Sequence, residues 1–177
     1  MVRALGPGSV SSFLKVILDV VYVVLWGCLG LLALVLVAAI LFAFNPALLP
    51  GVKVVNAEGI DLADRGPLIV GALAAASLYV GGVLLIVGTL RRIFVTLTAG
   101  DPFHPDNVRR LRVVGLILAA LEFGRYLFWV VSTYIPDVKE VDSNFSLTTW
   151  FSVLVVFVLA EVFREGARLR REAELTI

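Results

Sequence analysis

Four apolar segments, each long enough to cross a lipid bilayer as a helix, dominate the sequence. They cover about residues 14–44, 67–90, 111–134 and 147–167. The hydrocarbon core of a bilayer is about 30 Å thick and holds no water, so only a helix of about 20 residues or a closed barrel satisfies its backbone there. No alternation of apolar and polar residues is long enough for a barrel strand. The sequence therefore predicts an all-α integral membrane protein, a four-helix bundle.

Composition favours one membrane domain over residues 1–177. Hydrophobic residues make up 60% of the chain and charged residues only 16%, which is more apolar surface than a soluble fold of this size buries. The formal net charge is +1, so no basic field marks the chain as a direct binder of nucleic acid. The single cysteine, Cys28, excludes an intramolecular disulfide framework.

Lys and Arg residues fall mainly on one side of the predicted membrane. Eleven of the 15 lie near the N-terminus, around the central loop of residues 91–110, or in and just before the tail of residues 168–177. The other two loops carry an excess of Asp and Glu. Because cytoplasmic loops retain Lys and Arg, we expect the N- and C-termini and the central loop to be cytoplasmic. The two acidic loops should then face outward.

Four ionisable residues interrupt the apolar segments, and each costs about 2.5 to 3.5 kcal/mol at a helix centre. Glu122 and Arg125 lie three residues apart on one helical face, where they can pair. Their positions allow all four to form one polar cluster in the inner half of the bundle. For Glu122 and Arg125, a proton relay, cation relay or ligand pocket and a structural ion pair stay equally open. For the other two, the structural role is favoured because both lie within reach of water. The four residues are Asp19, Glu122, Arg125 and Glu161.

The central loop combines a turn signal with the start of a helix. The Gly-Asp-Pro run of residues 100–102 predicts a turn, and Phe103 can return to the apolar layer. His104 precedes a helix that should begin at Pro105, a favourable first position. His104 is the only histidine, whereas a metal site usually needs several His or Cys ligands. We therefore expect a helix cap here, and predict no metal and no cofactor.

Basic residues beside the membrane form a candidate docking surface for a partner or for anionic lipid. The tail continues the fourth apolar segment as a helix whose Arg and Glu side chains pair at spacings of three and four. The alternative interpretation of the arginines is a helix start plus a topology signal, which needs no partner. The candidate docking residues are Phe103, Arg109, Arg110, Arg164, Arg168 and Arg171.

Two segments resemble the signatures of a known family. Residues 159–167, LAEVFREGA, and the closing ELTI resemble the C-terminal signature of a bacterial family of small four-span membrane proteins, classed as a domain of unknown function. The GDPF run of residues 100–103, followed by Asn107, Arg110 and Leu111, resembles the family's other signature. The family commonly has two acidic residues near the end of the tail, where this chain has Arg171 and Glu172.

The resemblance implies a multi-pass protein of the bacterial cytoplasmic (inner) membrane. Members of the family are often encoded beside a short Cro/C1-type helix-turn-helix regulator. This context implies a membrane partner that holds or tunes a small transcription factor. The basic residues themselves would lie at the headgroup plane, so we expect no direct contact with nucleic acid.

Two functions from different classes therefore compete. The first is a non-enzymatic membrane partner or sensor that sequesters a small cytoplasmic helix-turn-helix regulator. The second is a small transporter or channel component that uses the intramembrane charges, and four helices alone would then require a homo-oligomer. A membrane enzyme is not predicted, because the sequence offers no metal ligand set, no nucleophile beside a base and no Gly-rich phosphate loop.

Overall fold

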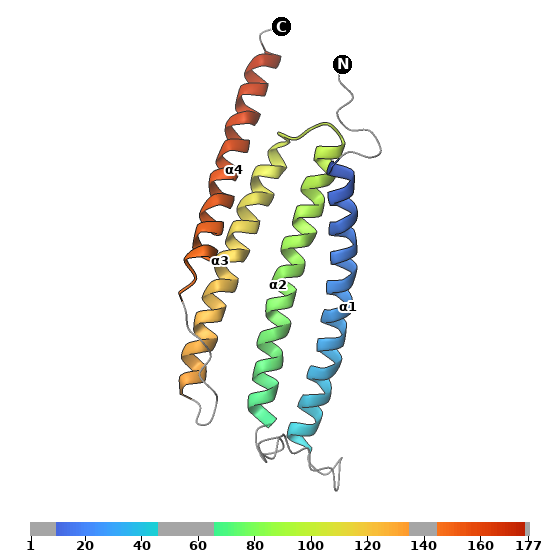
Figure 1. Cartoon of the computed structure of the whole chain (residues 1–177), viewed down its shortest axis with the longest axis vertical. Coiled ribbons are helices and arrows are strands. Elements are labelled where there is room, and N and C mark those ends of the chain that lie inside the picture. The colour runs from blue at the N-terminus through green and yellow to red at the C-terminus, as the bar shows by residue number, and fades with distance from the viewer. Residues whose placement is uncertain (1–9, 46–65, 135–144, 176–177) are drawn as a thin grey trace. The chain divides into compact units, whose positions relative to one another are not determined.

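Four long helices make up almost all of the described chain. The structure, a computed structural model, describes residues 10–45, 66–134 and 145–175 (Figure 1). The helices are α1 (Val10–Phe44), α2 (Gly66–Thr98), α3 (Pro105–Thr133) and α4 (Leu147–Glu174). All four are long and apolar enough to cross a membrane. The prediction of an all-α membrane fold is thus confirmed, and the described residues contain no strand.

The predicted loop of residues 91–110 is mostly helical. Helix α2 continues to Thr98 and α3 begins at Pro105, so the connection is only residues 99–104. Helix α2 continues because Ile93 and Leu97 belong to a packed apolar cluster. It ends beside Gly100, whose φ of 84° lies in the left-handed region that favours glycine. The acidic loops predicted to face outward lie largely outside the described residues.

Both of the later helices begin with a capping side chain. At α3 the backbone N–H of Asp106 donates to Nδ1 of His104, 3.2 Å away, which confirms the predicted cap. At α4 the N–H of Thr149 donates to Oγ of Ser146, also at 3.2 Å. Each cap satisfies an amide that has no partner inside its own helix. Pro105 at the first position of α3 has no amide hydrogen to satisfy.

The chain divides into two compact units, residues 24–81 and the remainder. In the smaller unit, Gly66 at the start of α2 lies against Ala43 near the end of α1, where an added Cβ would come within 3.0 Å of the Ala43 Cβ. Most side chains of α1 in this unit are exposed, as lipid-facing helices require. The described residues of this unit include no Asp, Glu, Lys, Arg or His.

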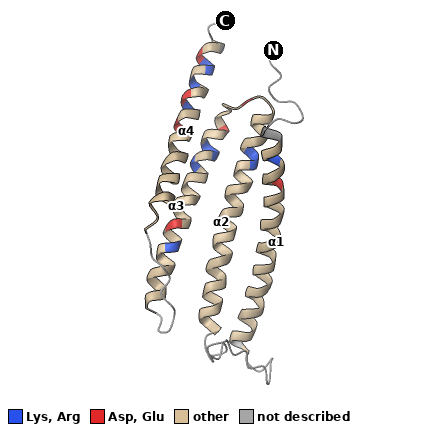
Figure 2. Ribbon diagram, in the orientation of Figure 1, with Lys and Arg blue, Asp and Glu red and all other residues tan. Residues whose placement is uncertain are grey.

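The larger unit contains the packed core. Its buried cluster joins α2, α3 and α4 through Ile93, Leu111 and Ala160. Helices α3 and α4 run antiparallel, as Figure 1 shows. Gly115 of α3 lies so close to Phe157 of α4 that an added Cβ would be 3.1 Å from its ring. Charged residues gather near the loop of residues 99–104 and along the end of α4, and acidic and basic residues also lie midway along α3 (Figure 2).

Candidate functional site

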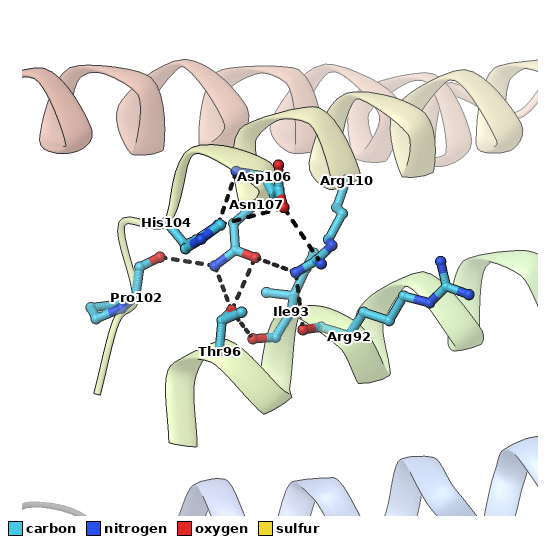
Figure 3. A network of polar contacts seen from close by, with 8 residues as sticks. All are labelled: Arg92, Ile93, Thr96, Pro102, His104, Asp106, Asn107 and Arg110. Atoms are coloured by element: carbon cyan, nitrogen blue, oxygen red, sulfur yellow. Dashed lines mark hydrogen bonds and ion pairs between the residues drawn. The ribbon is translucent and has the colours of Figure 1, made fainter. Parts of the chain in front are cut away.

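A fully buried asparagine joins the end of α2 to the start of α3 (Figure 3). Asn107 has no exposed surface. Its Nδ2 donates to the Thr96 hydroxyl at 2.7 Å and to the Pro102 carbonyl at 3.1 Å, and its Oδ1 accepts from Nη1 of Arg110 at 3.1 Å. Arg110 also donates to the carbonyl of Arg92, 3.2 Å away. A buried polar group is stable only when its hydrogen bonds are made, so this network holds the short loop in one conformation.

The same loop is fixed to α4 by what we call the loop–tail junction. It consists of Asp101, Phe103, Phe163, Gly166 and Arg170. The Phe103 and Phe163 ring centroids are 5.7 Å apart and the rings are tilted by 55°. The Phe103 ring lies over Gly166, where an added Cβ would be 2.5 Å from Cε1. Arg170 forms an ion pair and hydrogen bond with the Asp101 carboxylate.

The loop–tail junction brings together the two segments that resemble family signatures. Asp101 and Phe103 belong to the first signature, and Phe163 and Gly166 belong to the second. The sequence marks both segments but does not indicate that they touch. The available signal in the sequence was Gly166 followed one turn later by Arg170. The glycine leaves room for an aromatic ring, and the arginine can pair with an acidic side chain.

The candidate docking residues fall into two groups. Phe103 and Arg110 serve the architecture just described, Arg164 pairs with Glu161, and Arg168 pairs with Glu165 at 2.5 Å and Glu172 at 3.7 Å. Arg109 and Arg171 are exposed, and the described part of the chain supplies neither guanidinium with an acidic partner. These two arginines are the members of the set that stay available to another molecule.

A groove of about 540 Å³ lies between the first turn of α3 and the last turns of α4. Its apolar surface comes from both helices, and its charged surface comes from α4 alone. Arg171 contributes to it, whereas Arg109 does not. The lining residues are Pro105, Val108, Arg164, Glu165, Ala167, Arg168, Arg171, Glu172 and Leu175.

The intramembrane charges form three separate ion pairs, so the prediction of one polar cluster is wrong. Asp19 on α1 binds Arg91 on α2, with 2.5 Å between Oδ1 and Nε. Glu161 on α4 binds Arg164 on its own helix and lies 3.8 Å from Arg112 on α3. Since Arg112 is about 15 Å along α3 from Glu122, Glu161 cannot join the Glu122 pair.

The third pair, Glu122 with Arg125, is formed as the spacing on α3 predicts. The two side chains make two hydrogen bonds, 2.7 Å from Nη2 to Oε1 and 3.2 Å from Nε to Oε2. The Glu122 side chain is 6% exposed and that of Arg125 is 36% exposed. The Arg125 guanidinium also lies 4.8 Å from the Tyr126 ring centroid. This paired geometry lowers the cost of holding a carboxylate midway along an apolar helix.

In the part of the chain that the structure describes, no group of three His, Cys, Asp or Glu side chains is placed to hold a metal ion. His104 lies 3.7 Å from the carboxylate of Asp106, and its Nδ1 accepts the capping hydrogen bond from the amide of the same residue. The arrangement is that of a helix start.

Comparison with known proteins gives one result for the family and none for relatives. A family model described as "Protein of unknown function (DUF2975)" matches residues 55–177. The match includes the whole of α2, α3 and α4, and therefore the Asn107 network, the loop–tail junction and the groove. No curated protein and no solved structure matches the chain.

Proposed function

Because the chain belongs to the family described as "Protein of unknown function (DUF2975)", we propose its function from its geometry. The chain is a multi-pass membrane protein by its four apolar helices. It acts as a non-enzymatic membrane partner that holds a small soluble protein at the cytoplasmic face of a bacterial inner membrane. The partner is a short helix-turn-helix regulator, as the resemblance of the two signature segments implies.

The observation that carries the proposal is that α4 is longer than a membrane span and that its end belongs to a fixed structure. Helix α4 has 28 residues and is therefore about 42 Å long, whereas the hydrocarbon core is about 30 Å thick. About eight residues at the end of α4 lie beyond the core. A headgroup layer is only about 5 to 7 Å deep, so the last turn of α4 reaches past it.

The loop–tail junction keeps this projecting segment in place. Two aromatic rings, one ion pair and the buried Asn107 network connect it to α2 and α3. A binding surface that is already ordered loses less conformational entropy when a partner docks. An isolated helix end of this length would be marginally stable in water. Arginines that act only as a topology signal need no ordered tail. The junction therefore favours a docking role.

Retention at the membrane provides a simple mode of regulation. A small DNA-binding protein held against the cytoplasmic face is withdrawn from the pool that reaches DNA, and the withdrawn fraction depends on the concentrations and the dissociation constant. The membrane protein needs no catalytic group for this. Any signal that alters the docking surface would alter the free concentration of the regulator.

The test is recovery of the partner from the native host with the full-length chain. The tagged protein is purified in mild detergent, and the proteins recovered with it are identified by mass spectrometry. With the wild-type chain, we expect to recover a small helix-turn-helix protein. The Arg170→Asp variant should lose it. Adding Asp101→Arg to that variant restores the ion pair with its charges exchanged and should bring the protein back. Recovery of the chain only as a defined homo-oligomer, from wild type and both variants, would overturn the proposal.

The alternative function, an oligomeric transporter or channel component, has one observation in its favour. The Glu122–Arg125 pair lies midway along α3, where a charge is costly and is often functional. However, the described residues hold the intramembrane charges in three separate pairs, and steps of about 15 Å between pairs on α3 do not form a relay. The docking function is therefore preferred.

A further inference from the structure

We propose that Arg92 of α2 and Arg110 of α3 together bind the phosphate group of an anionic phospholipid in the inner leaflet. This site goes beyond the proposed function, because it takes a lipid and needs no soluble partner. Three observations support it: the geometry of the two arginines, the charge around them and their depth in the membrane.

The two arginines meet where α2 and α3 lie side by side. Nη1 of Arg110 donates to the carbonyl of Arg92 at 3.2 Å and to Oδ1 of Asn107 at 3.1 Å. Figure 3 shows Arg110 reaching from α3 to the backbone of α2 in this way. Because Asn107 is fully buried, these bonds hold the Arg110 guanidinium in a fixed position beside Arg92. A binding group that is already fixed loses little conformational entropy when its ligand arrives.

Both arginines keep N–H groups that a phosphate can use. The hydrogen bonds of Arg110 to α2 and Asn107 use Nη1, whereas Nη2 lies 4.0 Å from the Asp106 carboxylate, beyond hydrogen-bond distance. The Arg110 side chain is 26% exposed. The Arg92 side chain is exposed, and no acidic side chain of the described residues pairs with it. A guanidinium binds a phosphate through two parallel hydrogen bonds, and a phosphate has more acceptor sites than one guanidinium uses.

The charge around the two arginines favours an anionic lipid over a zwitterionic one. Residues 91–112, the α2–α3 hairpin, carry five arginines and two aspartates, an excess of three positive charges. Residues 15–19 of α1 carry one lysine and one aspartate, and residues 161–174 of α4 carry four arginines and four glutamates. Neither of those two segments has a net charge, so the positive excess lies on the hairpin. Basic residues beside a membrane attract anionic headgroups.

Two helices place Arg92 at the depth of lipid phosphates. Its neighbour Arg91 forms an ion pair with Asp19 on α1, so these residues lie at one level. No charged residue occurs in residues 20–44 of α1 or in residues 66–90 of α2, and each stretch is about 36 Å long. The hydrocarbon core is about 30 Å thick. Arg92 therefore lies just beyond the core, and its long side chain can extend to the headgroups.

Native mass spectrometry of the delipidated full-length chain in detergent tests the proposal. The probes are phosphatidylglycerol and phosphatidylcholine with the same acyl chains, so that only the headgroup differs. We expect the first phosphatidylglycerol to bind at least about tenfold more tightly than the first phosphatidylcholine. An excess of inorganic phosphate should not displace the lipid, because it lacks the acyl chains that hold a lipid against apolar helices.

Matched variants locate the site. Arg92→Gln should weaken phosphatidylglycerol binding about tenfold, whereas Arg109→Gln removes the same charge from the same hairpin and should change binding less than about twofold. Asp106→Asn removes the carboxylate that competes for Nη2 of Arg110 and should strengthen binding about threefold. All three replaced side chains are exposed, so each variant should unfold near the temperature of the wild type.

Three outcomes would overturn the proposal. Equal affinity for the two lipids would show that charge does not select the headgroup. Equal effects of Arg92→Gln and Arg109→Gln would indicate a diffuse attraction in place of a site. Displacement by inorganic phosphate would assign the two arginines to a soluble anion. None of these results depends on recovering a regulator from the native host, so the lipid site and the proposed function can fail separately.

Discussion

At the scale of single residues, the structure depends on a few side chains whose neighbours the sequence could not reveal. Asn107 is a polar residue two places into a helix, and nothing in its local sequence says that it is completely buried. His104 is different: a histidine followed by Pro105 and Asp106 predicts a helix start, and the cap is formed. Local chemistry within one turn was predictable, whereas contacts with another helix depend on how the helices pack.

The Asn107 network yields a prediction about stability. Asn107→Leu keeps the volume of the side chain and removes bonds to Thr96, Pro102 and Arg110. We expect a loss of about 1 to 3 kcal/mol in the free energy of unfolding, the cost of leaving buried polar groups unpaired. Denaturation in mixed micelles measures it. Thr98→Val is the control, since the Thr98 hydroxyl bonds only carbonyls of its own helix.

Gly166 yields a second prediction at this scale. Gly166→Ala places a methyl group 2.5 Å from Cε1 of Phe103, so the ring must leave Phe163. Gly124 has nothing within 4 Å, and alanine there should be neutral or stabilise the helix by up to about 1 kcal/mol. Gly166→Ala should not stabilise the helix in this way, and the backbone amides of the loop should exchange their hydrogens faster than in the wild type. Unchanged exchange in residues 99–104 would contradict the proposed role of the glycine.

At the scale of the helices, their number and type were predictable because a bilayer demands long apolar segments. The extent of the loop was not. Residues 91–98 contain arginines and end in Thr-Leu-Thr, so the sequence gives no reason to choose between a loop and a continued helix. Packing of Ile93 and Leu97 in the core decides it. The depth of each intramembrane charge likewise depends on the stagger between neighbouring helices, which is why Asp19 and Glu161 were expected beside Glu122.

The Glu122–Arg125 pair gives a prediction for α3. Glu122→Gln leaves a guanidinium without its carboxylate and should destabilise the protein by about 1 to 3 kcal/mol, less than for a fully buried pair because Arg125 is about one-third exposed. Replacing both residues by Leu should restore most of this loss. Glu161→Gln, in an exposed pair, should cost less than about 1 kcal/mol. Unchanged stability of Glu122→Gln with loss of function would instead make the pair a functional site.

At the scale of the whole molecule, orientation in the membrane is the prediction on which the docking function depends. In a chain with Cys28→Ala, a cysteine introduced by Arg168→Cys should react with a membrane-impermeant maleimide only after the cells are opened. A cysteine introduced by Lys139→Cys should react in intact spheroplasts. The asymmetry of Lys and Arg among the loops is the physical reason. Labelling of the Arg168→Cys variant in intact spheroplasts would place the groove on the wrong side.

The contact between the loop and the tail also sets an order of events during synthesis. Asp101 is made 69 residues before Arg170, and helix α4 must enter the bilayer between the two. Until then Phe103 has neither Phe163 nor Gly166 to cover it, so an unfinished chain displays an aromatic side chain at the membrane surface. The junction therefore forms only after translation has reached the tail, and it is the last contact between the loop and the rest of the chain to be made.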